Sequence, residues 1–433
     1  MRSPASLKQT QPNRPMTSAI SAPLHEQQYS LQHDRWIELL SHTDNLLLIQ
    51  DLDGVCMGLV NDPLHRNITT DYVEATQSFD GSFYVLTNGE HVGQRGVNGI
   101  IDRAYGRPQS GQYLPGLAAG GVQWQDRDGI VSHPGVSEAE LRFLKRVPDR
   151  IRTALWDFAQ SHDLDIDAST LAACINASAL DNIASPTANL NTFHRILGHD
   201  RDRYVALQKA MQALMDALLT EAAAQGLDHA FFVHYAPNHG RGADGKELIW
   251  LSQQAESGTT DFQFMVRGAI KEAGVLALLN RYYAQRTGQF PLGEAFNVRQ
   301  APHDHQDLLD LVKKNFDPAQ MPTVVGVGDT VTSVVTEAGA VKRGGSDRNF
   351  LHLVQDIGRH FGTGNVVTYV DSSGGELKNR KAIQLTDAGD RVLEGPGDPQ
   401  DHDDPLTLNV VFPGGHRQYC AAFQAAAQQR SQR

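Results

Sequence analysis

The sequence predicts an α/β protein in which a Rossmann-like parallel sheet is interrupted by an inserted α+β domain. Near the start, apolar strands over 46–50 and 83–90 flank a helical stretch over 71–79, an order typical of parallel pairing. The same alternation returns from a helix over 271–286 onward, whereas hairpins and long helices fill the region between. Because inserted domains usually enter at surface loops of a host, an insertion into one α/β domain explains the change of pattern.

The last third of the chain continues the host domain. "TVVGVGDT" predicts a strand over 323–330, and "DRNFLHLVQDIGRH" predicts a helix over 347–360. "NVVTYVD" and "TLNVVFPGG" add two strands, and "HRQYCAAFQAAAQQ" predicts a closing helix.

The inserted region has its own elements. "GVQWQDRDGIVSHPG" has the turn chemistry of a hairpin at Asp128 and Gly129. Helical patterns follow over 137–160, interrupted at Pro148, and over 203–225. Two strand patterns come next, at 230–237 and 247–251.

These shifts give a domain plan. We expect a disordered tail at 1–28, a catalytic core made of 29–105 and 259–433, and a cap domain at 106–258. The tail is rich in Ser, Pro, Gln and Ala and has no apolar core for a secretory signal. A cleaved organelle-type presequence is the less favoured interpretation of that segment.

Composition excludes several classes of function. Lys and Arg total 38 against 50 for Asp and Glu, a net charge of −12, and there is no basic cluster of the kind that binds nucleic acid. The three cysteines, Cys56, Cys174 and Cys420, form no CxxC pair, which favours a reducing, cytoplasmic setting. No apolar run approaches the roughly 20 residues that cross a bilayer, so we expect a soluble protein without a membrane partner.

The candidate site begins where "LLLIQ" runs into Asp51 and Asp53. On its own, an Asp-Gly pair after an apolar run is equally typical of a hairpin turn. Two further strands also end in polar groups, at Thr87 with Asn88 and at Asp329. The carboxyl ends of parallel strands share one edge of a sheet, where open α/β folds bind their ligands.

Lys271 adds a cation in the first turn of a helix, where an anion is also favoured. Together these groups suit phosphoryl transfer. A carboxylate nucleophile needs its own charge and the phosphate's charge offset, and Mg²⁺ and a lysine can do this. A second acid two residues further on lies on the same side of an extended segment, within reach of the leaving oxygen.

The ordered motifs "DLDG", "LTNG", "GAIKEAG" and "GVGDT" resemble those of the haloacid dehalogenase superfamily of phosphatases. The resemblance implies that Asp51 is the nucleophile and that Asp53 is the general acid and base. It implies that Thr87, Asn88 and Lys271 bind phosphate. It also implies that Mg²⁺ is held by Asp51, Asp329 and the backbone carbonyl of Asp53.

One position departs from the superfamily pattern. The acid that usually follows "GD" within a few residues is separated from Asp329 by "SVVTEAGAVKRGG", which predicts an inserted hairpin. The next good candidate is Asp347. It is either a Mg²⁺ ligand, directly or through water, or only the N-cap of the following helix.

The insertion falls where one class of this superfamily carries a cap over the sugar of a sugar phosphate. Over about 28–425 the chain resembles the glucosylglycerol-phosphate phosphatase family. The resemblance is carried by long sequence segments, from "DLDGVCM" through "LDNIASPTANLNT" and "SGTTDFQFM" to "FPGGH". This resemblance implies a phosphoric monoester hydrolase that releases glucosylglycerol, a compatible solute, from its 3-phosphate in salt stress. The synthase that makes this substrate is a possible partner.

Two alternatives stay open. The core motifs fix the reaction but not the sugar, so a sucrose- or trehalose-phosphate type of phosphatase is the nearest alternative. A non-catalytic regulatory protein that binds the sugar phosphate is the other, and the presence of the acids and the lysine argues against it.

Polar residues beside the expected site are candidates for substrate contacts. A sugar needs several donors and acceptors beside apolar faces. One group follows the Thr87 strand: Glu90, His91 and Arg95. The other group lies in the cap and near the return to the core: His234, Tyr235, Asn238 and Asp261.

Several other patterns are interpreted as structural. "GRGADGKE" at 240–247 is one residue from a P-loop, but a strand follows it, which favours a hairpin turn. His303 and His305 could suggest a metal site, and Asp304 as a helix cap is the better interpretation. Cys56 is expected to be a small packed residue. The acids of the loop at 394–405 are expected to face solvent: Asp401, Asp403 and Asp404.

Overall fold

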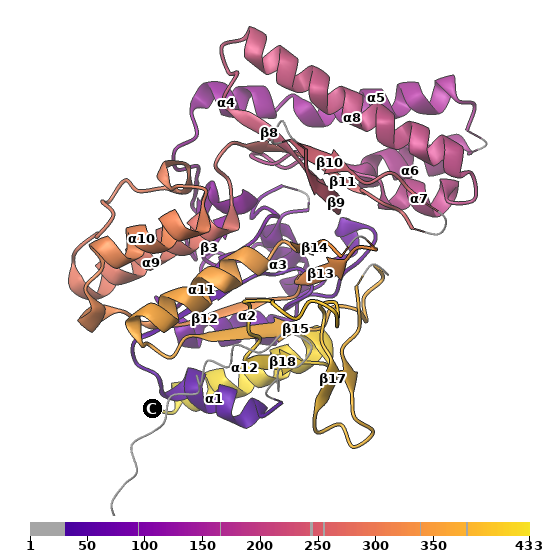
Figure 1. Ribbon diagram of the computed structural model, residues 1–433. Helices are drawn as coiled ribbons and strands as arrows, with labels where there is room; N and C mark the ends of the chain where they lie inside the picture. The colour runs from indigo at the N-terminus through magenta and orange to yellow at the C-terminus, as the bar shows by residue number, and fades with distance from the viewer. Residues whose placement is uncertain are drawn as a thin grey trace, which may run out of the picture.

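A computed structural model describes residues 31–93, 95–164, 166–242, 246–253, 256–337, 339–377 and 380–433. The tail expected at 1–28 lies outside these residues. Figure 1 shows a core built around one large sheet, with a smaller cap of helices and strands above it. Within the described part of the chain, no helix combines the length and apolar character that crossing a membrane requires.

The core sheet has eight strands in the order β18-β15-β12-β1-β2-β3-β4-β5. Neighbours from β18 to β3 are parallel, and β4 and β5 extend the sheet as an antiparallel hairpin. The strands are β1 (Leu46–Gln50), β2 (Phe83–Leu86), β3 (Gly116–Ala118), β4 (Gln123–Gln125), β5 (Val131–Ser132), β12 (Thr323–Gly328), β15 (Val366–Val370) and β18 (Val410–Phe412). The parallel sheet with an inserted unit confirms the expected fold class.

Helices cover both faces of this sheet. Successive side chains of a strand point to opposite faces, so Leu46 and Leu48 of β1 enter one apolar layer and Leu47 and Ile49 enter the other. The helices of the first layer are α1 (His33–His42), α2 (Thr70–Ala75), α3 (Val97–Tyr105) and α12 (Gly415–Ser431). Those of the second are α9 (Lys271–Thr287), α10 (His305–Asn315) and α11 (Arg348–Phe361).

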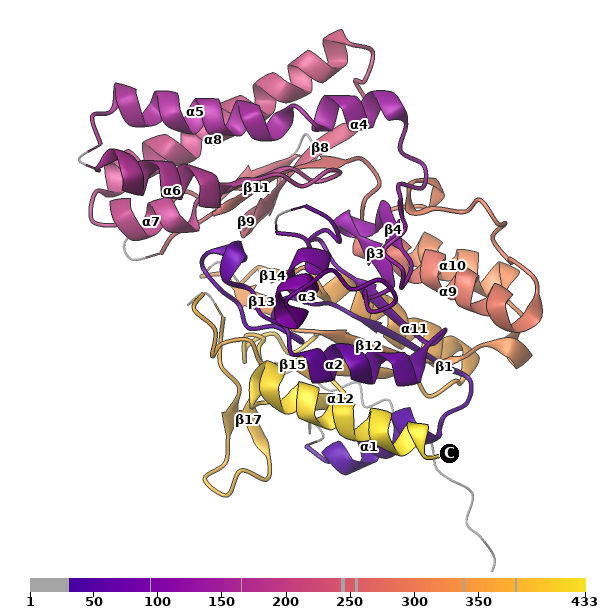
Figure 2. The same ribbon diagram turned by 180° about the vertical axis from the view of Figure 1, so that it is seen from behind.

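The cap has its own antiparallel sheet in the order β6-β7-β11-β8. Its strands are β6 (Ala179–Leu180), β7 (Thr187–Asn189), β8 (Phe231–Ala236) and β11 (Asp261–Val266), beside a hairpin of β9 (Asn238–Arg241) and β10 (Glu247–Ile249). Its helices are α4 (Glu138–Leu144), α5 (Val147–Ser161), α6 (Ala168–Ser178), α7 (Asn191–Leu197) and α8 (Arg201–Ala224). Figures 1 and 2 show α5 and α8 on the side of the cap sheet away from the core.

The sheets divide the chain differently from the boundaries expected at 106 and 258. Strands β3 to β5 belong to the core sheet, because Gly116 pairs with Val85 of β2. Strand β11 belongs to the cap sheet, where it lies between β7 and β8. Short apolar strands do not reveal which sheet they join. A tertiary contact shows how closely β3 approaches β2. A Cβ on Gly116 would lie 2.2 Å from the carbonyl oxygen of Val85, so glycine is needed at this position.

Smaller features agree with the sequence. The hairpin expected after Asp329 is present as β13 (Thr332–Val335) and β14 (Val341–Gly344), and a further hairpin joins β16 (Gln384–Leu385) to β17 (Val392–Glu394). The interruption expected at Pro148 is the break between α4 and α5, where Pro148 occupies the first turn of α5.

Candidate active site

Three buried carboxylates meet at the carboxyl edge of the core sheet. Asp51 follows β1, Asp329 follows β12, and Asp347 immediately precedes α11. One oxygen from each lies within 4.8 Å of the others, and the residues are only 6%, 2% and 0% exposed. The parallel topology therefore brings together acids that are up to about 300 positions apart in the sequence.

Lys271 lies among these acids at the start of α9. Its Nζ is 2.7 Å from Asp51 Oδ2 and 2.7 Å from Asp347 Oδ1, and the residue is 3% exposed. The backbone N–H of Leu52 donates to the other oxygen of Asp51 at 2.8 Å. Both oxygens of Asp51 are thus held, which fixes the orientation of its carboxylate.

Asp347 does not cap its helix. Although it stands at the N-cap position of α11, its side chain makes no cap hydrogen bond. Its Oδ2 instead accepts from the backbone N–H groups of Asp329 and Thr330, at 2.9 and 3.0 Å. The N-cap interpretation is wrong, because these donors and Lys271 compete for the carboxylate. Asp347 binds the end of β12 to the cluster.

Burial has the largest effect on the pKa values of the three acids. Burial raises the pKa of Asp51 well above its usual value, against the opposing effect of Lys271. Burial and the neighbouring Asp347 raise the pKa of Asp329 to about 7. Burial also works against ionisation of Asp347, but Lys271 and the two backbone donors hold its pKa below the usual value. Lys271 acts on Asp51 and Asp347, and the charge of Arg380 lowers the pKa of Asp329, but burial outweighs these cations at Asp51 and Asp329.

The cluster fits a divalent cation. Asp329 Oδ2 is buried without a hydrogen-bond partner, and carboxylate oxygens are the ligands that hard cations prefer. Gly54 has no side chain, and the carboxylate of Asp329 occupies the space beside it. A Cβ on Gly54 would lie 2.1 Å from Asp329 Oδ2, and the φ of +79° also favours glycine. The donor set and the unpartnered oxygen together point to a cation between the three acids.

Asp53 stands beside the cluster and is the more open of the first two acids. Its Oδ1 is 2.9 Å from Nε of Arg66, and its side chain is 26% exposed. Thr87 Oγ1 accepts from the N–H of Gly89 at 3.2 Å. A Cβ on Gly89 would lie 3.6 Å from Thr87 Oγ1 and 3.9 Å from Asp53 Oδ2, so both side chains border one small space. Asn88, next to Thr87, is half-buried.

The residues expected as substrate contacts at Glu90, His91 and Arg95 are 2%, 0% and 3% exposed, and their polar groups bond to other parts of the protein. Glu90 accepts from the backbone N–H groups of the cap loop Ile183–Ser185, at 2.6–2.8 Å. His91 Nε2 lies 3.2 Å from the carbonyl oxygen of Gly116.

The guanidinium of Arg95 donates to the carbonyl oxygens of Asn176 and Ala179, also in the cap. Glu90 and Arg95 therefore bind the cap to the core, and their charges are used in that contact.

The expected cap residues lie on the strands β8 and β11 and on the hairpin beside them. Glu247 Oε2 receives hydrogen bonds from the N–H of Tyr235 and from Asn238 Nδ2, and it lies 2.9 Å from His234 Nδ1. Tyr235 is buried. Asp261 accepts from Asn189 Nδ2 at 2.7 Å, and burial raises its pKa.

Sequence reasoning missed Arg66. It lies in the loop "LVNDPLHRNI", which has no periodicity that could mark it. Besides its ion pair with Asp53, its Nη1 donates to the carbonyl oxygen of Arg95 at 3.4 Å, and its charge lowers the pKa of Asp261 in the cap. Arg66 is therefore a cation between Asp53 and the cap sheet.

The residues interpreted as structural are largely confirmed. The segment 240–247 lies in the β9–β10 hairpin, of which 243–245 are outside the described residues. Asp304 caps α10 by accepting from the N–H groups of Gln306 and Asp307, and Cys56 is buried. Asp403 is exposed as expected.

Two acids of the loop at 394–405 do not face solvent. Asp401 is 0% exposed and bound by both guanidinium arms of Arg343, and Asp404 is 4% exposed and paired with Arg348. Tertiary partners override the polar composition of this loop, because a buried carboxylate is stable when an arginine satisfies it.

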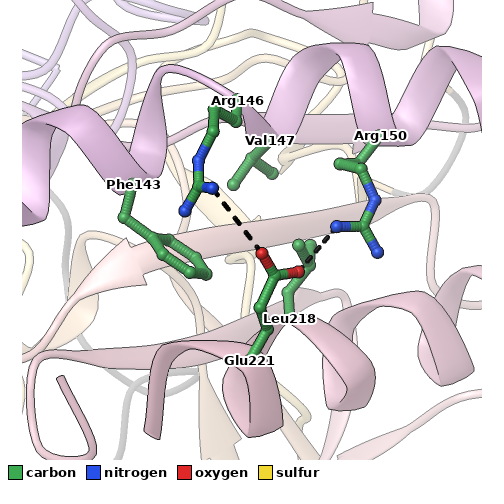
Figure 3. Close-up of a pocket in the computed structure, with 6 residues that line it drawn as sticks. All are labelled: Phe143, Arg146, Val147, Arg150, Leu218 and Glu221. Atoms are coloured by element: carbon green, nitrogen blue, oxygen red, sulfur yellow. Dashed lines mark hydrogen bonds and ion pairs between the residues drawn. The ribbon is translucent and has the colours of Figure 1, made fainter. Parts of the chain in front are cut away.

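A hollow in the cap is separate from this chemistry. Figure 3 shows it between the α4–α5 junction and α8, with Arg146 and Arg150 pointing toward Glu221 at 3.8 and 2.6 Å. Glu221 pairs with both arginines and offsets the charge of one of them. It offers no carboxylate pair or lysine like those at the edge of the core sheet.

A family model described as glucosylglycerol-phosphate phosphatase matches residues 45–427. The chain belongs to this family. A Synechocystis protein named glucosylglycerol-phosphate phosphatase is 58% identical over 414 residues, which cover 94% of this chain and 98% of the relative. This protein is therefore a phosphatase.

Two solved structures were also compared with this phosphatase. An Aspergillus fumigatus trehalose-6-phosphate phosphatase aligns at 8% identity and a TM-score of 0.37, over 93% of this chain and 100% of that chain. The C-terminal domain of a C. albicans trehalose-6-phosphate phosphatase aligns at 10% identity and a TM-score of 0.43, over 93% and 98%. At these scores neither structure supports an inference about this phosphatase.

Proposed function

We propose that this phosphatase hydrolyses glucosylglycerol 3-phosphate to glucosylglycerol and phosphate, with Mg²⁺ as its cofactor. The observation that carries the chemistry is the buried cluster of Asp51, Asp329 and Asp347 around Lys271. The name of the Synechocystis relative supports the choice of substrate. Three hard oxygen donors around one space support Mg²⁺ over softer metals.

The reaction proceeds through Asp51. One carboxylate oxygen attacks phosphorus, the bond to the ester oxygen breaks, and Asp53 gives its proton to the departing alcohol. Water then loses a proton to Asp53 and attacks the aspartyl-phosphate, which releases phosphate and restores Asp51. Thr87, Asn88 and Lys271 bind the phosphoryl oxygens. Asp51, Asp329, Asp347 and the backbone carbonyl of Asp53 would hold Mg²⁺, which would offset the charge of the nucleophile and the phosphate.

The cap supplies the sugar contacts in this proposal. His234, Asn238 and Asp261 carry polar groups on the cap sheet and its hairpin, and Arg66 links Asp53 electrostatically to Asp261. Tyr235 is buried and serves the cap core, so its role is to support this surface. Closure of the cap over bound sugar excludes water from the aspartyl-phosphate. A smaller radius of gyration in solution scattering with substrate is expected, and an unchanged profile would count against closure.

The setting of the reaction is part of the proposal. In this proposal the enzyme releases a compatible solute in the cytoplasm during salt stress, and the synthase that makes the phosphorylated solute is its partner. Co-purification of the synthase with this phosphatase tests the partnership. A synthase that elutes separately at all salt concentrations would contradict it.

The deciding experiment measures phosphate release from glucosylglycerol 3-phosphate, sucrose 6-phosphate and trehalose 6-phosphate side by side, with Mg²⁺ and with chelator. We expect release from the first alone, lost with chelator and with Asp51→Asn. Release from another sugar would keep the mechanism and change the substrate. Folded wild-type protein that binds a sugar phosphate without turnover would contradict the proposal.

A further inference from the structure

A second cluster of metal-ligand side chains lies on the outer helices of the core. His305 begins α10, and His352 and Asp356 lie one turn apart on α11. Nε2 of His305 is 2.9 Å from Asp356 Oδ2, and Nε2 of His352 is 3.3 Å from the same oxygen. The two imidazole rings stack with their centroids 4.4 Å apart. One ligand atom from each residue lies within 4.8 Å of the others.

We propose that His305, His352 and Asp356 form a site for a divalent transition metal of the Zn²⁺ type, which links α10 to α11. These helices lie side by side in Figure 1, and the metal would connect the segment that follows residue 302 to the helix that follows Asp347. The site is separate from the acidic cluster of Asp51, Asp329 and Asp347.

The distances between the ligand atoms suit a small cation. Zn²⁺ binds nitrogen and oxygen ligands at about 2.0–2.2 Å in tetrahedral geometry, which separates neighbouring ligands by roughly 3.3 Å. The separations from Asp356 Oδ2, 2.9 and 3.3 Å, are close to this value, and the stacked imidazole rings must turn so that both Nε2 atoms face one ion. Two imidazoles and one carboxylate leave a fourth position for water.

The ligand chemistry distinguishes this site from the acidic cluster. Imidazole nitrogens favour Zn²⁺, Co²⁺ and Ni²⁺, whereas an all-carboxylate site favours Mg²⁺. A solution that contains both kinds of cation can therefore load the two sites separately.

One oxygen of the Asp356 carboxylate is already paired with an arginine. Arg359 Nη1 lies 3.3 Å from Asp356 Oδ1. Arg359 pairs with the carboxylate oxygen that does not face the imidazoles, so Oδ2 stays available to the metal.

Untagged full-length protein in saturating Mg²⁺ is titrated with Co²⁺, and the visible absorption of the four-coordinate ion is recorded. We expect one Co²⁺ per chain, displaced by Zn²⁺. His305→Gln and His352→Gln should each weaken Co²⁺ binding by at least about tenfold, since even outer-shell partners cost that much. His303→Gln is the matched control, because His303 is exposed on the same segment and lies outside the cluster.

A thermal scan gives the second readout. Zn²⁺ should raise the melting temperature of wild type and of His303→Gln, but not of the two cluster variants. Circular dichroism without metal checks that all three variants are folded. Absence of the Co²⁺ band in wild type, or equal binding by wild type and both cluster variants, would overturn the proposal.

Discussion

Lys271 and Asp347 form a buried ion pair, with Nζ 2.7 Å from Oδ1, and the same Nζ lies 2.7 Å from Asp51. One lysine thus contacts both the proposed nucleophile and the acid that holds the end of β12. Nζ of Lys271 also lies 5.7 Å from the centre of the Phe350 ring on α11. The apolar surroundings strengthen the pair and also make an unmatched charge costly.

Lys271→Met should make the fold depend on pH and on metal. Removing one partner of a buried pair costs about 3–5 kcal/mol of unfolding free energy, and here Asp51 and Asp347 both lose the cation that contacts them. The loss should be larger at pH 8 than at pH 5.5, because the acids can protonate at the lower pH. Mg²⁺ should restore part of it. Urea unfolding at both pH values measures this, with exposed Lys209→Met as the control. Equal losses at both pH values would contradict this account.

Gly54→Ala should disable the site through Asp329. The new Cβ would meet Asp329 Oδ2 at 2.1 Å and displace it, and a misplacement of 1 Å can cost about 10²-fold in rate. Gly106→Ala is the matched control, since Gly106 has φ +71° and no atom within 4 Å of the new Cβ. Phosphate release and Mg²⁺ titration should separate backbone strain, which both variants share, from the loss of Asp329. Equal activity in the two variants would argue against the contact.

Arg66→Met should impair turnover more than stability. The ion pair with Asp53 is partly exposed, so its loss should change the unfolding free energy by under about 1 kcal/mol. A hydrogen bond to a charged group is worth about 1.5–3 kcal/mol, so kcat/KM should fall about 10- to 100-fold if Arg66 serves the bound phosphate ester. Arg66→Lys should recover part of the rate, and exposed Arg103→Met should have no effect. Full activity of Arg66→Met would show that Arg66 has no role in turnover and contributes only to the structure of the substrate-free enzyme.

His91 should make the fold sensitive to acid. Burial lowers its pKa from 6.5 to about 4, so the unfolded chain binds a proton at a higher pH than the native state does. Its contribution is present above pH 6.5 and is lost as the pH falls toward 4, a change of about 3 kcal/mol. Urea unfolding at pH 7.5, 6 and 5 should show a shallower decline for His91→Gln. An identical decline would assign the acid sensitivity to other groups.

Glu90→Gln should loosen the cap. The carboxylate accepts three backbone N–H groups of the loop Ile183–Ser185, and an amide NH₂ placed there would face donors. The cost of an unsatisfied buried group is about 1–3 kcal/mol. Hydrogen exchange should rise in peptides that cover 181–190 and stay unchanged in β1. Glu138→Gln, at a fully solvated side chain of the cap, is the control. Unchanged protection of 181–190 would show that other contacts hold the cap.

The sequence by itself determined the elements and the chemistry of the first motifs. The strand at 46–50, the strand end at Asp329 and the hairpin after it follow from local apolar runs and turn residues, and the structure has them at nearly the same positions. Local propensity acts within a few residues, so sequence reasoning reaches it. The resemblance of four short motifs then gave the acids and the lysine that the structure brings together.

The tertiary structure decided which polar residues face the site. Glu90, His91 and Arg95 have the residue types of substrate contacts but lie under the cap, and Asp401 and Asp404 are covered by arginines from distant strands and helices. It also decided that β3 joins the core sheet and β11 the cap sheet. These outcomes depend on contacts between residues far apart in the chain, and the energy of such contacts comes from burial and pairing that no local pattern records.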